Sequence, residues 1–153
     1  MKILALDLGT HCGWAIYNDS WARPEYGTEL FELARGESAG LRFIRFRRWF
    51  EEVLEPGTAL VVYEQPHLRG GYATDLLVGF ATRVQEICAE RDVPYKGVHS
   101  GTIKKFATGT GKGSKKEMTT AATRLWNVVP GNDNEADALC LLKWAVETLA
   151  KEN

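Results

Sequence analysis

The sequence has no long hydrophobic run, few cysteines and almost no net charge, and each absence excludes a class of protein. No stretch of about 18 apolar residues occurs, so we expect no segment to cross a membrane. The opening residues are apolar only as far as Asp7, which does not resemble a secretory signal peptide. The three cysteines, Cys12, Cys88 and Cys140, form neither a disulfide framework nor a CxxC metal motif. We therefore expect a reduced, cytoplasmic protein, either of a cell or of a virus-infected host cell.

The net charge of −1 gives no argument for a nucleic-acid partner, but the charge is unevenly distributed along the chain. Residues 35–48 hold five arginines against one acid, and residues 100–117 hold five lysines against one acid. The lysines are Lys104, Lys105, Lys112, Lys115 and Lys116. Such clusters either contact phosphate groups or simply face solvent, and charge alone does not decide between the two.

The hydrophobic pattern predicts one α/β domain over residues 1–153, because no linker or internal repeat divides the chain. Short apolar runs predict strands at residues 2–8, 13–17, 28–34, 59–63 and 95–98. Short connections join the first three strands, which indicates an antiparallel three-strand meander. Helical spacing predicts helices at 41–54, 74–91 and 101–107, from residue 114, and after residue 131. We expect a mixed central β-sheet flanked by helices.

Two helix starts carry capping residues. Ser114 and Glu117 have the spacing of a capping box, in which each side chain bonds the backbone N–H of the other. Asn132 or Asp133 is expected to cap the last helix, which follows Pro130-Gly131.

Three acidic residues stand where predicted strands end or the last helix begins. Asp7 and Glu64 directly follow apolar strand residues, and Asp137 lies between two alanines near the start of the last helix. A carboxylate beside a core run is costly to bury unless it is paired or binds a cation. Taken singly, each acid also has an ordinary explanation as a turn residue, an edge charge or a first-turn acid.

Together the three acids indicate a site for a hard divalent cation. Mg²⁺ takes oxygen ligands and keeps several waters, with Mn²⁺ as a substitute. Two such ions about 4 Å apart can activate water and stabilise the leaving 3′ oxygen of a phosphodiester. Asp133, Asn134 and Glu135 precede Asp137, and any of them can complete the site or simply cap the helix.

Four blocks of the sequence resemble RuvC-type Holliday-junction resolvases of the RNase H-like superfamily. They are residues 6–10 (LDLGT) with 13–15 (GWA), 62–66 (VYEQP), 102–115 (TIKKFATGTGKGSK) and 134–138 (NEADA). The blocks occur in the family's order and extend over nearly the whole chain. Asn134 departs from the family pattern, which usually has Asp or His there, and this puts the second metal site in doubt.

The resemblance implies an RNase H-like fold and a homodimer that makes paired nicks in four-way DNA. It implies that Asp7, Glu64 and Asp137 are catalytic metal ligands, joined by Asn134 if a second ion binds. It further implies that Lys115 aids catalysis and, with Lys104, Lys105, Lys112 and Lys116, contacts DNA. In the family, the stretch after the second acidic strand reaches the junction centre, where Tyr72, His67 or Leu68 can stack on a base.

Three alternative functions follow from the same motifs. Actin-like ATPases and sugar kinases share the Asp-x-Gly-Thr opening, but they need two such domains and this chain carries one copy. The glycine-rich loop is not a Walker motif either, because Gly113 follows Gly111-Lys112 where Ser or Thr is required. An RNase H-like nuclease acting on other branched DNA or on RNA–DNA hybrids, and a junction-binding protein without activity, remain alternatives to the resolvase.

Overall fold

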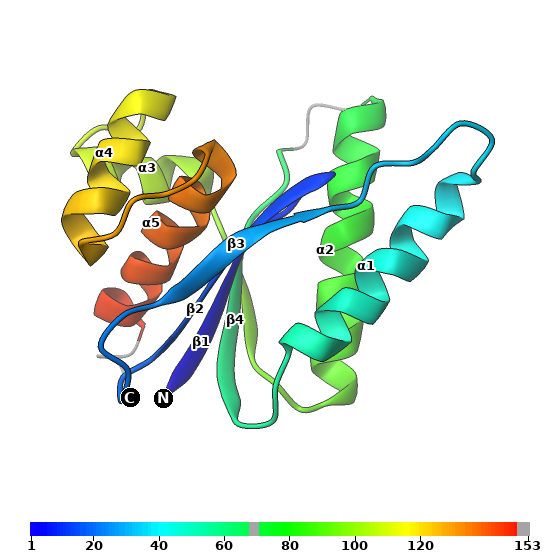
Figure 1. Cartoon of the computed structure of the whole chain (residues 1–153), viewed down its shortest axis with the longest axis horizontal. Coiled ribbons are helices and arrows are strands. Elements are labelled where there is room, and N and C mark those ends of the chain that lie inside the picture. Colours follow the sequence, from blue (N-terminus) through cyan, green and yellow to red (C-terminus); the bar gives the residue numbers. More distant parts are fainter. Residues whose placement is uncertain (68–70, 150–153) are drawn as a thin grey trace.

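A five-stranded mixed sheet runs through the middle of the computed structural model, which describes residues 1–67 and 71–149 (Figure 1). The strand order is β3-β2-β1-β4-β5. The strands are β1 (Lys2–Asp7), β2 (His11–Asn18), β3 (Glu25–Leu30), β4 (Thr58–Glu64) and β5 (Tyr95–Val98). β1 to β3 pair antiparallel, whereas β4 is parallel to both β1 and β5. The predicted meander and mixed sheet are therefore confirmed.

Helices cover both faces of the sheet (Figure 1). They are α1 (Ala39–Val53) and α2 (Tyr72–Glu90) on one face, and α3 (Ser100–Thr108), α4 (Lys115–Trp126) and α5 (Asp133–Thr148) on the other. Side chains of β1 alternate between the two layers, because successive residues of a strand point to opposite faces. Ile3 and Ala5 pack in the core beneath α5, while Leu4 and Leu6 pack in the core beneath α1 and α2. None of the helices in the described ranges has the length and hydrophobicity to cross a bilayer.

The third strand begins and ends earlier than the predicted 28–34. Its pairing with β2 runs from Glu25 opposite Ile16 to Leu30 opposite His11. The chain then leaves the sheet because Phe31, which is 2% exposed, turns into the core against Phe46 and Phe80. The pattern after Leu30 thus reflects burial of one aromatic side chain, and not continued pairing.

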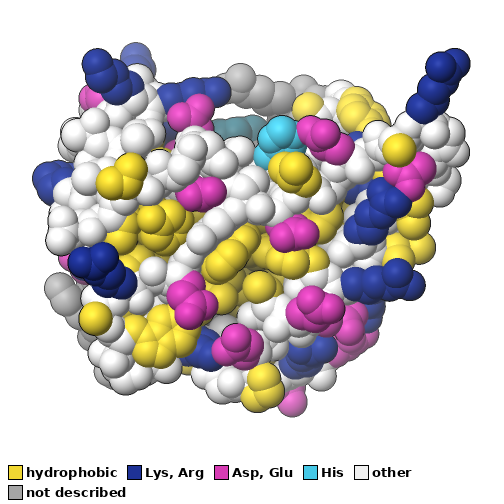
Figure 2. All heavy atoms as spheres, in the orientation of Figure 1, with side chains coloured by type: hydrophobic (Ala, Val, Ile, Leu, Met, Phe, Trp, Pro, Cys, Tyr) yellow, Lys and Arg dark blue, Asp and Glu magenta, His cyan; other side chains and the backbone are white. Residues whose placement is uncertain are grey.

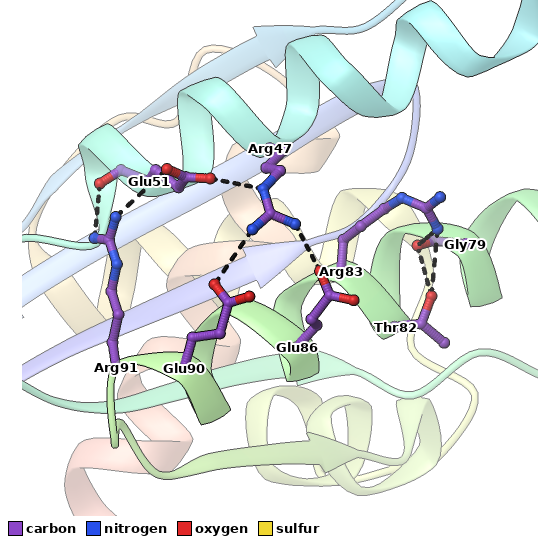
Figure 3. A network of polar contacts seen from close by, with 8 residues as sticks. All are labelled: Arg47, Glu51, Gly79, Thr82, Arg83, Glu86, Glu90 and Arg91. Atoms are coloured by element: carbon purple, nitrogen blue, oxygen red, sulfur yellow. Dashed lines mark hydrogen bonds and ion pairs between the residues drawn. The ribbon is translucent and has the colours of Figure 1, made fainter.

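Two of the five arginines in residues 35–48 pair with neighbouring acids: Arg45 with Glu37, and Arg47 with three glutamates. Arg47 of α1 bonds Glu51 of the same helix and both Glu86 and Glu90 of α2, at 2.6–3.2 Å (Figure 3). Exposed ion pairs of this kind each contribute about 1 kcal/mol or less. Together they tie α1 to α2. Arg47 of this basic segment therefore serves packing between the two helices.

Both predicted helix caps are present. Ser114 and Glu117 form the reciprocal hydrogen bonds of a capping box at the start of α4. Asn132, not Asp133, is the N-cap of α5, and its side chain accepts a hydrogen bond from the backbone N–H of Glu135 at 2.9 Å. These caps fix where α4 and α5 begin, and both helix starts lie near the acidic site described next.

Candidate active site

The three predicted carboxylates lie around one small cavity of about 20 Å³. Its lining residues are Leu6, Asp7, Glu64, Ser100, Ile103, Lys104, Met118, Asp137 and Leu141. Asp7 and Glu64 meet there because β1 and β4 are parallel neighbours, with Leu6 paired to Tyr63, and both strands end at the same edge of the sheet. α5 packs on β1 and β2 and brings Asp137 to this edge.

A close backbone contact places the first turn of α5. Gly13 pairs with Asp7 across β1 and β2. A Cβ atom on Gly13 would lie 2.0 Å from the backbone oxygen of Asn134. Only glycine permits this approach, because the obstructing atom belongs to backbone and not to a flexible side chain. Gly13 therefore lets the helix that carries Asp137 lie directly over the end of β1.

We expect Gly13→Ala to destabilise the protein by about 3 kcal/mol or more, because the added methyl would force α5 away from β2. The measurement is the free energy of unfolding from urea denaturation. Gly40→Ala is the matched control, since Gly40 lies in α1 with nothing within 4 Å of its Cβ position. That variant is expected to be as stable as wild type or more stable, by up to about 1 kcal/mol. Equal stabilities of the two variants would contradict the close contact.

Burial and mutual repulsion raise the pKa values of the carboxyl groups. Burial raises the pKa of Asp7 well above its usual value, and the charges of Asp137 and Glu64 raise it further. The pKa of Asp137 is raised to about 6 by burial, by Glu64 and by Asp133, against the opposing effect of Lys104 and Lys115. The site therefore holds more negative charge than its nearby lysines offset, and a cation would be stabilised there.

Three basic side chains lie near Glu64. Burial raises the pKa of Glu64, whereas His67, Lys104 and His99 lower it. Lys104 also lowers the pKa of Asp137, so one lysine side chain faces two of the three carboxylates. Contact of Lys104 with DNA stays a prediction.

The carboxylates at the cavity are of the type that binds a divalent cation, but their side chains do not converge on one point. No group of three or more His, Cys, Asp or Glu side chains within residues 1–67 and 71–149 is arranged to hold a metal ion. The cavity has room for about one water molecule. Three acidic side chains around one cavity nevertheless match the oxygen ligands that Mg²⁺ prefers.

The residues before Asp137 have separate roles. Glu135 accepts hydrogen bonds from Thr28 and from the Gly131 N–H, so its carboxylate supports the start of α5. Asp133 lies 3.6 Å from the Lys115 ammonium and adds to the negative field on Asp137. Of the three residues considered for completing the site, Asp133 is the acid whose charge acts on Asp137. Asn134 as a metal ligand stays a prediction.

The predicted DNA-contacting lysines do not all lie at the cavity. Lys104 lines it, and Lys115 reaches Asp133 beside it. Lys116 instead lines a separate groove of about 340 Å³ between α3 and α4. Lys105 and Lys112 are exposed and do not line the cavity. In the space-filling view, Lys and Arg side chains project mostly from the two flanks, and acidic side chains are spread over the central face (Figure 2).

Tyr72 is the first residue of α2 and is 70% exposed. Its hydroxyl accepts a hydrogen bond of 3.1 Å from Arg42, a buried side chain that also donates to the Phe31 carbonyl. The hydroxyl is thus held by Arg42, while most of the residue is exposed. Leu68 lies outside the described residues, and base stacking by Tyr72 or His67 stays a prediction.

Sequence reasoning missed Ser100 as a site residue and treated His67 and His99 singly. Ser100 is 8% exposed, lines the cavity, and its Oγ lies 2.9 Å from Nε2 of His67. The position of Ser100 after a predicted strand was a signal for it. Because β5 runs parallel to β4, the residues that follow β5 reach the same edge of the sheet as Glu64. Using it required knowing that β4 and β5 pair.

The arrangement of the sheet, the helices and the acidic edge is that of an RNase H-like fold. No protein-family model matches the chain. Two structures of Thermus thermophilus RuvC share the fold, at 21% identity. One has a TM-score of 0.75 and covers 96% of each chain. The other, solved in complex with Holliday junction substrate, has a TM-score of 0.80 and covers 99% of this chain and 96% of that one.

Sequence comparison points to the same proteins. Crossover junction endodeoxyribonucleases RuvC of Corynebacterium efficiens and Corynebacterium glutamicum are each 26% identical over 148 residues, or 92% of this chain. The chain spans 66% and 67% of these relatives' lengths. The resemblance to RuvC-type resolvases that the motifs indicated is therefore confirmed by independent comparisons of sequence and of structure.

Proposed function

We propose that this protein is a metal-dependent DNA endonuclease that resolves four-way junctions by paired, symmetric nicks as a homodimer. The observation that carries the proposal is the meeting of Asp7, Glu64 and Asp137 at one edge of a RuvC-like sheet. Four-way DNA is proposed as the substrate because the relatives are named crossover junction endodeoxyribonucleases. One related structure also holds a Holliday junction.

Asp7, Glu64 and Asp137 would hold Mg²⁺, with Mn²⁺ as a substitute, and Asp133 or Asn134 would serve a second ion. When bound, such ions activate a water and stabilise the leaving 3′ oxygen of the phosphodiester. The three carboxylates are half-buried, each at the end of a strand or near the start of a helix. Lys104, which faces Glu64 and Asp137, offsets negative charge that develops on the phosphate.

The remaining lysines would bind the DNA backbone around the cavity. Lys115 and Lys116 lie in the first turn of α4, and Lys112 lies in the loop that connects α3 to α4. Lys105 lies in the last turn of α3. Such contacts set the position of the strand without reading its bases. Tyr72, which is 70% exposed, would stack on an unpaired base at the junction centre.

We expect Lys112→Ala to weaken junction binding and to reduce the slope of log affinity against log salt by about 1, the effect of losing one phosphate contact. The measurement is a salt titration of binding to a labelled junction without divalent metal. Lys143→Ala is the control. Lys143 lies on α5, where it pairs with Glu147, and its ammonium lies over the Trp126 ring. An unchanged slope for Lys112→Ala would contradict a phosphate contact at this position.

The experiment that tests the proposed function compares substrates. Purified protein is incubated with an end-labelled four-way junction, linear duplex, a branched three-way DNA and an RNA–DNA hybrid, with Mg²⁺ or with chelator. Symmetric, Mg²⁺-dependent nicks in the four-way junction alone are expected. Cutting of the hybrid or of branched DNA in general would favour another RNase H-like nuclease. Tight junction binding without cutting in any divalent metal would identify a binding protein.

A further inference from the structure

Two histidines and a serine form a polar cluster at the rim of the carboxylate cavity. Nε2 of His67 lies 2.9 Å from Oγ of Ser100, and the His67 and His99 rings meet edge to face with centroids 5.8 Å apart. Both imidazoles are exposed, whereas Ser100 is buried and lines the cavity. The cluster joins the segment after β4 to the start of α3, beside Glu64.

Ser100 is held rigidly by the backbone around it. It is the first residue of α3, and the N-cap carbonyl of His99 accepts hydrogen bonds from the backbone N–H groups of Thr102 and Ile103. The Gln65 N–H bonds the Val98 carbonyl at 2.8 Å, which fixes the end of β5 against the end of β4. The backbone at Ser100 is therefore fixed, and its hydroxyl lies within hydrogen-bond distance of the His67 ring.

The direction of this hydrogen bond and the tautomer of the imidazole determine each other. Within the described ranges, His67 is the hydrogen-bond partner of the Ser100 hydroxyl, and Nδ1 of His67 has no partner. A neutral imidazole carries a proton on one nitrogen and accepts at the other. When the Ser100 hydroxyl donates to Nε2, the ring proton lies on Nδ1. An exposed N–H donor then faces solvent near the three carboxylates.

We propose that His67, positioned by Ser100, donates a hydrogen bond from Nδ1 to a phosphate oxygen of the DNA strand that lies over the carboxylate cavity. This inference rests on the proposed function, since it requires a nucleic-acid strand at the site. Ser100 is a positioning residue that acts through His67, and His67 touches the substrate. The pair adds an imidazole N–H donor where lysines alone otherwise contact phosphate, and it fixes the direction of that contact.

Stacking of the His67 ring on a base is the competing role for the same side chain, and substitutions separate the two. Phenylalanine keeps a flat ring but loses the N–H, whereas glutamine keeps a donor but loses the ring. If His67 donates to phosphate, His67→Phe weakens junction binding as much as His67→Ala does, and His67→Gln recovers part of the affinity. Recovery by phenylalanine instead of glutamine would overturn the proposal in favour of stacking.

The first measurement determines which nitrogen of the His67 ring carries the proton, in the absence of DNA and metal. In ¹⁵N-edited NMR of the imidazole groups, His67 of the wild type is expected to show the Nδ1–H form, and Ser100→Ala is expected to lose that preference. His11, an exposed histidine bonded to Glu32, is the internal control and should not change. A wild-type His67 ring with its proton on Nε2 would overturn the proposed direction of the hydrogen bond.

The second measurement is junction binding in chelator, followed by single-turnover cleavage. His67→Ala and Ser100→Ala are each expected to weaken binding about tenfold, the effect of losing a hydrogen bond to a charged group. Ser100→Ala added to His67→Ala should have no further effect, because the serine acts through the histidine. His11→Ala should bind as wild type does.

Failure of this inference differs from failure of the proposed function. A wild-type protein that binds and cuts the junction, with His67→Ala equal to it in both, would overturn the role of His67 and leave the nuclease intact. A wild-type protein that binds no junction would overturn the proposed function, and the phosphate contact with it. Additive effects of the two substitutions would overturn the positioning role of Ser100.

Discussion

Asp7→Asn is expected to abolish junction cleavage and, at the same time, to make the metal-free protein more stable at pH 7. Cleavage should fall at least about a thousandfold, because the side chain is one of three acids that would hold the ion activating the water. Stability should rise by about 1 kcal/mol or more, because the substitution removes a buried charge that Asp137 and Glu64 repel. The measurements are single-turnover cleavage and the free energy of unfolding in chelator.

Asp19→Asn is the matched control for this substitution. Asp19 is exposed and bonds the N-terminal amine, an arrangement that lowers the pKa of its carboxyl group. Its replacement should leave cleavage unchanged and should not increase stability. An Asp7→Asn protein that cuts at the wild-type rate would contradict the assignment of Asp7, and one that unfolds more easily than wild type would contradict the electrostatic strain at the cavity.

Wild-type stability in chelator is expected to fall as the pH rises from about 4 to above 6. The folded state raises the pKa of Asp137 from 3.8 to about 6, so between these values the folded protein binds more protons than the unfolded chain. The stabilising contribution of Asp137 is therefore fully present below its pKa in the unfolded chain. It is lost as the pH rises through its pKa in the folded protein. Asp137 alone contributes about 3 kcal/mol to this loss. The raised pKa of Asp7 acts in the same direction.

Divalent metal is expected to reverse this loss above pH 7. An ion that binds only the folded protein stabilises it by about 2.7 kcal/mol at a concentration of 100 times Kd. The measurement is Tm in chelator, in Mg²⁺, in Mn²⁺ and in NaCl of matched ionic strength, at pH 4, 6 and 8. Asp7→Asn should show a smaller metal response. A Tm that rises from pH 4 to pH 8 in chelator and ignores divalent metal would contradict the shared acidic site.

The sequence predicts most of this fold because its signals are local. The strands are short apolar runs, and the caps at Ser114 and Asn132 need only neighbouring residues. Convergence of Asp7 and Glu64 depends in addition on the pairing of β1 with β4, since these parallel strands end at one edge of the sheet. The predicted end of β3 was wrong because Phe31 is buried by α1 and α2. No pattern within residues 28–34 reveals this burial.

What the sequence could not predict depends on contacts between distant segments. The hydrogen bond from Ser100 to His67 spans 33 residues and exists because β4 and β5 pair. The close approach of Asn134 to Gly13 sets the height of α5 above the sheet. The use of Arg47 as a link between α1 and α2 similarly required knowing which acids of α2 face α1.

The most direct test of the central claim is cleavage of a supercoiled plasmid that extrudes a cruciform. A homodimer that places one carboxylate site on each of two opposing strands makes paired nicks, and paired nicks convert the plasmid to a linear product. We expect linear plasmid with Mg²⁺ or Mn²⁺, none with chelator, and none with Asp7→Asn. Plasmid that stays supercoiled in every divalent metal, although the protein binds the cruciform, would contradict the account.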